Sequence, residues 1–312
     1  MSVPAVDPGI QSLLETAGTG VFPVRGLDAV LAGPRRYALL RAHPDTPVDD
    51  RVKVKNLYIP GPAGHLRLRV YRPGAPEDLP VILYVHGGAY TYGSPEAEEG
   101  RALRYARDAQ AVVVSVDYRL APEHPYPAAA DDAYAALAWI AASPAEFGGG
   151  PGRIAVAGGS AGGNIAASTV LRARDQAGPR VLFQSLTYPG VDGSLSTASA
   201  REFTGTPVLN RGALELAVRY YAKDSHAAPY VSPVRAADLS GLPPACIAVA
   251  EADPLRDEGR DYAARLSAAG VTTELVQVPG AVHGFDLLFP WARISERSLT
   301  DQVRALREAL HP

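Results

Sequence analysis

The chain of 312 residues is long enough to bury a sizeable core, as one large domain or two small ones. Its hydrophobic content of 47% and charged content of 20% are ordinary for a soluble globular protein. The formal net charge of −3 gives no electrostatic reason to expect nucleic acid or an anionic membrane surface as a partner, and no window approaches the roughly 18 apolar residues of a membrane span.

The first fifty residues contain two helical candidates, 9–17 and 27–43, before any strand. They show no basic segment followed by a continuous apolar run, so no secretory signal is expected. The single cysteine, Cys246, forms no intrachain disulfide and is interpreted as a small buried hydrophobic residue. These features together predict a cytoplasmic protein.

Two alternating segments predict an antiparallel hairpin at one edge of a sheet. In "HLRLRVYR" (65–72), Leu66, Leu68 and Val70 fall on one face and the basic residues on the other, as in a half-exposed strand. The segment "RVKVKNLYI" (51–59) precedes it across the turn "PGPAG".

The later strands are mostly continuous apolar runs, which are typical of strands covered on both faces. They span 81–85, 111–116, 153–158, 181–186, 245–250 and 273–278. Helical segments alternate with them, over 100–109, 127–143, 161–175 and 256–270, and a last helix places Leu299, Val303, Leu306 and Leu310 at helical spacing. This order predicts an α/β fold with a mostly parallel eight-stranded sheet and helices on both faces.

A long excursion over residues 188–240 separates the sixth strand from the seventh. It exceeds a plain connection of a few residues and contains one helical segment, 212–224, with Asn210 as its expected N-cap. We expect it to pack with residues 1–50 as a helical cap over a catalytic core formed by 51–187 and 241–312.

The loop after the third strand, "HGGAY", is a candidate oxyanion hole. Glycines let the backbone approach a reacting carbonyl closely, so the amides of Gly87 and Gly88, together with that of Ala161, are candidate donors to a developing negative charge. His86 is interpreted as a structural residue that anchors the loop.

The segment "GGSAG" (158–162) places Ser160 in a G-x-S-x-G motif between an apolar strand and a helix, the context that a nucleophile elbow requires. Side chains at Gly158 and Gly162 would collide in this turn. A phosphate-binding loop fits poorly, since no G-K-[ST] follows and the glycine spacing is not G-x-G-x-x-G. The motif therefore predicts a serine nucleophile.

A serine nucleophile needs a base, and that base needs an orienting acid. "EADPLRDEG" follows the seventh strand with four candidate acids, Glu251, Asp253, Asp257 and Glu258. "PGAVHGF" follows the eighth with His283, the candidate base. The order Ser, acid, His is that of α/β hydrolases, and each residue comes just after a strand, where open α/β sheets place their sites.

Over nearly its whole length the sequence resembles the bacterial hormone-sensitive-lipase family of carboxylesterases, within the α/β-hydrolase fold. The resemblance rests on motifs that occur in the family's order and spacing: "HGGAY", "DYRLAPEHPYPAA", "GGSAGGN", "YVSPVRA", "DPLRDEG" and "HGF". It implies Ser160 as nucleophile, Asp253 as acid, His283 as base, and Gly87, Gly88 and Ala161 as oxyanion donors. It also implies a cap made of the N-terminal segment and the insertion, and no cofactor or metal.

Two positions depart from the family pattern. Ala89 replaces the third glycine of H-G-G-G, and Gly159 stands where the family commonly has Asp or Thr before the nucleophile. The second departure removes a side chain that could brace the elbow in relatives.

We predict a serine esterase that cleaves short-acyl esters through an acyl-enzyme. The alternatives are the same residues acting on an amide, a lactone or a carbamate, and a ligand-binding receptor built on this fold. The family often pairs through its edge strand, here 273–278, so a homodimer is a further expectation.

Overall fold

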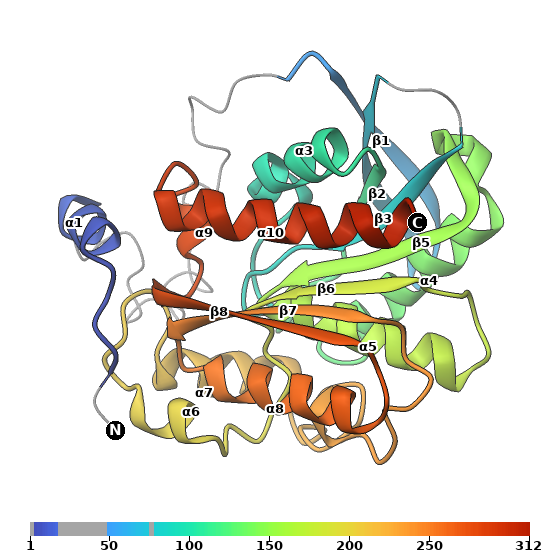
Figure 1. Ribbon diagram of the computed structural model, residues 1–312. Helices are drawn as coiled ribbons and strands as arrows, with labels where there is room; N and C mark the ends of the chain where they lie inside the picture. Colours follow the sequence, from blue (N-terminus) through green and yellow to red (C-terminus); the bar gives the residue numbers. More distant parts are fainter. Residues whose placement is uncertain (1–2, 18–48, 75–77) are drawn as a thin grey trace.

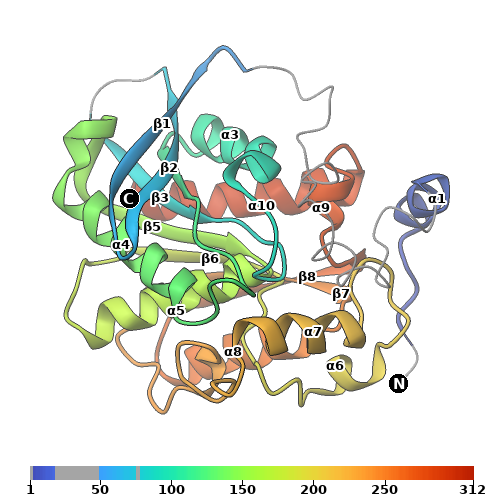
Figure 2. The ribbon, with the colours of Figure 1, turned by 180° about the vertical axis from the view of Figure 1, so that it is seen from behind.

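The computed structural model describes residues 3–17, 49–74 and 78–312, in which eight strands form one sheet (Figures 1 and 2). The strands are β1 (Val52–Gly61), β2 (Gly64–Pro73), β3 (Leu79–Val85), β4 (Val112–Val116), β5 (Gly149–Gly159), β6 (Phe183–Thr187), β7 (Ala245–Ala252) and β8 (Thr273–Val282). All eight strands predicted from the sequence are present.

The strand order is β1-β2-β4-β3-β5-β6-β7-β8. β1 and β2 form the antiparallel hairpin, with Leu57 opposite Leu68, and β2 also runs antiparallel to β4. Every other neighbouring pair is parallel. The mostly parallel α/β sheet predicted from strand–helix alternation is thus confirmed, and β8 lies at its edge.

Helices cover both faces of the sheet because side chains alternate along buried strands. On β4, Val114 packs in a core with helices α4 (Ala128–Ala142), α5 (Ala161–Asp175) and α8 (Arg256–Ala268). Its neighbour Val113 points to the other core, with α3 (Glu99–Asp108) and α10 (Arg293–Leu310). Leu306 and Leu310 on α10 are fully buried there, so the predicted apolar stripe faces the core.

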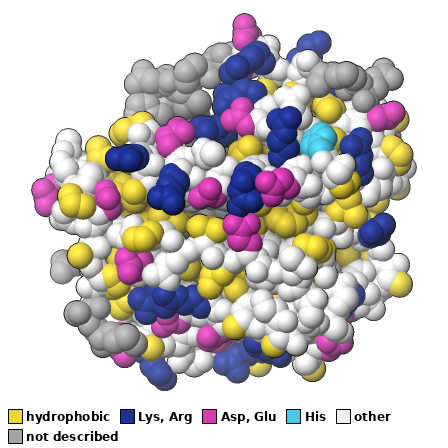
Figure 3. Space-filling model, in the orientation of Figure 1, with side chains coloured by type: hydrophobic (Ala, Val, Ile, Leu, Met, Phe, Trp, Pro, Cys, Tyr) yellow, Lys and Arg dark blue, Asp and Glu magenta, His cyan; other side chains and the backbone are white. Residues whose placement is uncertain are grey.

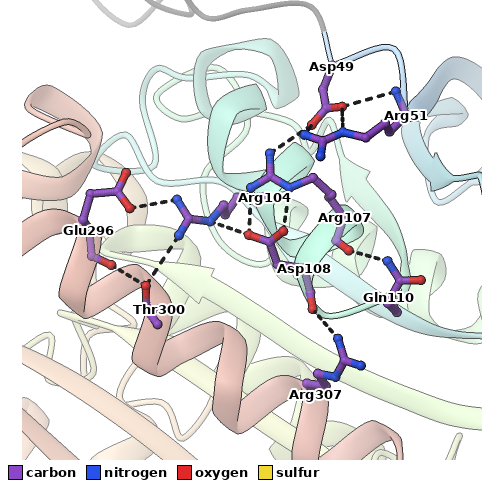
Figure 4. A network of polar contacts seen from close by, with 9 residues as sticks. All are labelled: Asp49, Arg51, Arg104, Arg107, Asp108, Gln110, Glu296, Thr300 and Arg307. Atoms are coloured by element: carbon purple, nitrogen blue, oxygen red, sulfur yellow. Dashed lines mark hydrogen bonds and ion pairs between the residues drawn. The ribbon is translucent and has the colours of Figure 1, made fainter.

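The outer side of α3 and α10 carries a network of charged side chains (Figure 4). Arg104 on α3 pairs with Glu296 on α10 at 3.0 Å, and Arg307 donates to the carbonyl oxygen of Asp108 at 3.2 Å. In the space-filling view, positive and negative side chains are interspersed along this face, with hydrophobic ones between it and the lower helices (Figure 3).

The insertion after β6 contains α6 (Ala198–Glu202) and α7 (Arg211–Tyr221), followed by the short 3-10 helix η5 (Pro233–Arg235). As predicted, Asn210 caps α7, accepting a hydrogen bond from the amide of Ala213 at 3.2 Å. Leu214 and Tyr221 on α7 are buried, which holds this helix against the core.

The remaining described elements are smaller. They are α1 (Pro8–Ala17), α9 (Phe285–Leu288) and the 3-10 helices η3 (Pro95–Glu98) and η4 (Pro144–Phe147). α1 matches the first predicted helix, and it is linked to the end of β8 by a hydrogen bond from Asp7 N to Gly280 O of 2.9 Å. The second predicted helix, 27–43, lies outside the described residues. In the part of the chain that is described, no helix has the length and apolarity needed to cross a bilayer.

Candidate active site

Ser160 lies at the sharp turn between β5 and α5, with backbone angles of φ 58° and ψ −122°. A non-glycine residue rarely adopts this conformation, so the turn is strained. Both glycines lie against neighbouring backbone in this turn: a Cβ on Gly158 would overlap Gly162 O, and one on Gly162 would overlap Val85 O. The predicted steric reason for both glycines is therefore correct.

His283 and Asp253 meet Ser160 at the carboxyl ends of β8, β7 and β5. The Nε2 atom of His283 lies 2.9 Å from Ser160 Oγ, and its Nδ1 atom lies 2.7 Å from Asp253 Oδ2. Asp253 follows β7 directly and is fully buried, and its Oδ1 accepts the Leu255 amide at 2.9 Å. The three side chains form a continuous hydrogen-bonded chain from carboxyl to imidazole to hydroxyl.

The other acids of "EADPLRDEG" lie elsewhere. Glu251 accepts the amide of Gly280 at 2.8 Å, and Asp257 accepts the amide of Ser199 at 2.8 Å while pairing with Arg256. Glu258 accepts the amide of Asp192 at 3.2 Å. None of these three carboxyl groups is hydrogen-bonded to His283 within the described residues, which leaves Asp253 as its partner.

The "HGGAY" loop differs from our prediction at one donor. The Gly87 amide is already engaged, because it donates to Glu98 Oε1 at 2.6 Å, and the Tyr84 hydroxyl holds the other oxygen of that carboxyl. No acceptor among the described residues is bonded to the amides of Gly88, Ala89 or Ala161. Gly87 is thus a wrong assignment: its amide fixes the loop, and the free donors of the loop are one residue further along.

The backbone beyond Gly87 turns sharply. Gly88, Ala89 and Tyr90 all have positive φ, of 117°, 49° and 62°. The carbonyl of Gly88 accepts the amides of Thr91 and Tyr92, closing the turn. His86 is buried at its base and stacks on Tyr118 with ring centroids 4.2 Å apart, in keeping with the structural part we assigned to it.

A buried ion pair under the site was not foreseen from the sequence. Arg101 on α3 pairs with Asp286 on α9 at 2.8 Å, with side chains only 3% and 2% exposed. Both contact the hydroxyl of Tyr188, which receives a bond from Arg101 at 3.0 Å and donates to Asp286 at 2.6 Å. The Tyr188 ring lies 4.7 Å from the His283 ring, so this cluster supports the imidazole from below.

A cavity of about 40 Å³ opens beside Ser160. Its walls come from the oxyanion loop, the elbow, the insertion and the start of α8, and include Ala89, Ala161, Leu214, Tyr221, Leu255 and Glu258. Most of them are apolar. Burial raises the pKa of Glu258 well above its ordinary value.

Among the residues that the structure describes, no group of three or more His, Cys, Asp or Glu side chains is arranged to hold a metal ion.

Comparisons with known proteins show which family the chain belongs to. The family described as alpha/beta hydrolase fold matches residues 82–287. The chain is 42% identical to the carboxylesterase NlhH of Mycobacterium tuberculosis over 320 residues, covering 99% of this chain and 97% of that protein. It is 43% identical to the esterase LipI of the same organism over 288 residues, covering 90% and 88%.

Solved structures give the same result. A bacterial heroin esterase superposes with a TM-score of 0.88 at 36% identity, over 100% of both chains. An esterase of Pyrobaculum calidifontis superposes with a TM-score of 0.87 at 38% identity, over 97% of this chain and 98% of the other.

Proposed function

The chain belongs to the hormone-sensitive-lipase-like family of α/β hydrolases and is a carboxylic ester hydrolase, and from this premise we propose that Ser160, His283 and Asp253 are its catalytic triad. The observation that supports this assignment most strongly is the unbroken chain of hydrogen bonds, 2.7 Å from Asp253 to His283 and 2.9 Å from His283 to Ser160.

In the first half of the reaction, Ser160 Oγ attacks the ester carbonyl while His283 Nε2 takes the hydroxyl proton. The carbonyl oxygen becomes an oxyanion, and the free amides of Gly88, Ala89 and Ala161 are in place to donate to it. The tetrahedral intermediate then collapses, and His283 returns the proton to the departing alcohol, which leaves an acyl group on Ser160.

In the second half, water takes the place of the alcohol. His283 removes a proton from the water, which attacks the acyl carbonyl, and the same amides stabilise the second oxyanion. Collapse breaks the bond to Ser160 Oγ, the acid leaves, and the serine proton is restored from His283. Asp253 holds the imidazole in the tautomer that points Nε2 at the serine.

Short acyl groups are the proposed substrates. The cavity beside Ser160 measures only about 40 Å³, which favours a short acyl chain over a long one. A higher kcat/KM for a long-chain triglyceride than for a butyrate ester would contradict this. Amides, lactones and carbamates remain the alternative substrates for the same residues, and matched ester and amide analogues compare them directly.

Two further proposals concern the environment of the chain. We place it in the cytoplasm because its lone cysteine, Cys246, is a buried thiol whose pKa burial raises to about 12, so it is suited neither to a disulfide nor to catalysis. We also retain the homodimer through the edge strand β8.

The division into a core and a cap (1–50 and 188–240) is proposed likewise, since α7 contributes Leu214 and Tyr221 to the cavity.

Labelling with a fluorophosphonate tests the nucleophile. Only an activated serine attacks phosphorus quickly, so the wild-type chain should be labelled once, on the peptide containing Ser160. Ser160→Ala should abolish labelling and ester hydrolysis, whereas the control Ser267→Ala, at an exposed position of α8, should leave both intact. Labelling that survives Ser160→Ala would refute the assignment.

A further inference from the structure

The cavity beside Ser160 lies on the acyl side of the site. In the proposed reaction His283 protonates the departing alcohol, so the alcohol must lie next to the imidazole. The cavity is lined by Ser160 and by Ala89 and Ala161 of the oxyanion hole, and His283 is not among its walls. The group that enters it is therefore the acyl chain, which stays on the enzyme after the alcohol has left.

The walls of this acyl pocket are mostly hydrocarbon. Leu214 and Tyr221 come from α7, and the Tyr221 ring stacks on Tyr90 with centroids 3.9 Å apart and planes 2° from parallel. Leu255 closes another side. Such a pocket accommodates a plain alkyl chain. The acidic residues in its walls therefore need an explanation.

Glu258 is the polar group that an apolar pocket does not need. It lies in the first turn of α8, lines the cavity and is only 1% exposed. Its Oε1 accepts the amide of Asp192 at 3.2 Å, but its Oε2 has no hydrogen-bond partner among the described residues. Leaving a buried oxygen without a partner is costly, and a ligand that supplies the missing partner would explain why this one is retained beside the nucleophile.

Glu258 is also close to the nucleophile. The Gly190 amide donates to Ser160 O at 3.2 Å, and a Cβ built on Gly190 would lie 3.8 Å from both Glu258 Oε1 and the Tyr90 hydroxyl. Ser160 and Glu258 also line the same cavity, so an acyl chain carried by Ser160 enters the pocket that contains this carboxyl group.

The surroundings favour an uncharged carboxylic acid at this position. Asp192, whose amide contacts Glu258, has Arg235 as its own ion-pair partner at 2.8 Å, and the Asp192 carboxylate opposes a second negative charge on Glu258. Burial is the largest effect and raises the pKa of Glu258 well above its ordinary value, although the backbone amides of Asp192 and Val191 act in the opposite direction. A neutral acid carries an O–H group, so the free oxygen is available as a hydrogen-bond donor.

We propose that Glu258 binds substrate in the acyl pocket, and that the preferred short acyl groups carry a second acceptor oxygen, as an ether, keto or hydroxyl group, which pairs with its free carboxyl oxygen. This inference rests on the proposed function. An alkyl chain would leave the donor buried and unpaired, whereas an acyl chain with an oxygen at the right depth satisfies it. Sites that hydrogen-bond a substrate group discriminate strongly against analogues that lack it.

The test uses pairs of esters of one alcohol in which a single CH2 of the acyl chain is replaced by oxygen. Suitable pairs are butyrate with methoxyacetate, and pentanoate with ethoxyacetate and with 3-methoxypropanoate. The measured quantity is the ratio of kcat/KM for the oxygen-containing ester to that for the alkyl ester, compared between enzymes so that intrinsic ester reactivity cancels. The enzymes are wild type, Glu258→Gln, which keeps a donor, Glu258→Met, which is apolar and of similar length, and the control Asp261→Asn on the exposed side of α8.

For at least one pair, Glu258→Met should lower the ratio about five- to tenfold, the size expected for one neutral hydrogen bond. Glu258→Gln should keep it within about threefold of wild type, and Asp261→Asn should leave it unchanged. Fluorophosphonate labelling of Ser160 in each variant separates this test from that of the triad: a chain that labels and hydrolyses alkyl esters has the proposed function whatever the ratio.

Three results would overturn the inference. The first is a ratio that Glu258→Met leaves unchanged for every pair. The second is a ratio that Glu258→Gln raises more than tenfold, since that would mean an ionised carboxylate repelling the oxygen. The third, a wild-type preference for 3-aminopropanoate that Glu258→Gln abolishes, would assign the pocket to cations. If Glu258→Met does not fold, the wild-type enzyme alone decides the test. Its ratio for each ester pair is then divided by the ratio of the rates at which hydroxide hydrolyses the same two esters. A quotient of one or below for every pair would overturn the proposal.

Discussion

Gly159, immediately before the nucleophile, has no side chain with which to brace the elbow, and Arg101 occupies the space beneath it. A Cβ on Gly159 would lie 3.3 Å from Arg101 Nη1. The guanidinium is held there by Asp286 and Tyr188, which also contacts the His283 ring. The space beside Gly159 is thus occupied by a buried ion pair whose members come from α3 and α9.

Breaking this ion pair should be costly. Arg101→Met leaves Asp286 buried without its cation, which typically costs about 3–5 kcal/mol of unfolding free energy. The double variant Arg101→Met with Asp286→Leu removes both charges and should be clearly more stable than the single one. Urea denaturation followed by circular dichroism measures both. A loss of unfolding free energy below about 1 kcal/mol for Arg101→Met would show that this ion pair does not stabilise the fold.

The acid of the triad can be tested against its neighbour. Asp253→Asn should leave the fold intact and lower kcat by up to about 10⁴, because the imidazole loses the partner that fixes its tautomer. Asp257→Asn should lower the melting temperature, since its carboxyl group holds the Ser199 amide and Arg256, and should leave kcat within about tenfold. A nearly inactive Asp257→Asn together with an active Asp253→Asn would show that Asp257, and not Asp253, is the acid of the triad.

At the scale of elements, α10 is attached to the sheet in two ways, through its buried leucines and through the charged network on its outer side (Figure 4). Leu306 is fully buried, whereas the Arg104 side chain that pairs with Glu296 is 24% exposed. Burial removes water from an apolar surface, but ion pairs of this exposure are screened by solvent. The buried leucines of α10 should therefore contribute more to the free energy of unfolding than the charged network does.

This difference is measurable. Leu306→Ala should lower the unfolding free energy by about 2–5 kcal/mol, as deletions in packed cores do. Arg104→Ala should lower it by no more than about 1 kcal/mol, and less at high salt. Equal losses from the two variants in urea titrations would mean that the surface network, and not the core, holds α10.

The sequence was most informative where a pattern was local. Alternating segments predicted the first two strands and apolar runs the other six, and Asn210 predicted the start of α7, because strand burial and capping depend on neighbouring residues. The Gly87 donor was wrong because its amide is taken by Glu98, which lies eleven residues further along and was not foreseen as its partner. The pairing of Arg101 with Asp286 could not be predicted from the sequence either, since only folding brings α3 and α9 together.

At the scale of the whole molecule, β8 forms one edge of the sheet, and no further strand of the described residues pairs with it. Leu275 on this strand is 44% exposed, and hydrophobic side chains are visible on the same face of the molecule (Figure 3). An open edge is a ready template for pairing with a second copy. We expect a dimer by light scattering of the purified chain, and Leu275→Lys should shift it toward monomer. A wild-type monomer at high protein concentration would contradict the edge-strand dimer.

Detection of the acyl-enzyme tests the proposed mechanism most directly, because this intermediate forms only if the nucleophile, the base and the oxyanion amides act together. The wild-type chain is mixed with 4-nitrophenyl butyrate, quenched in acid within the first turnover and analysed by intact-protein and peptide mass spectrometry. We predict a single added butyryl group on the peptide that contains Ser160, absent from Ser160→Ala and lost with time as the acyl-enzyme hydrolyses. Butyryl on another residue, or hydrolysis by Ser160→Ala at the wild-type rate, would contradict the mechanism.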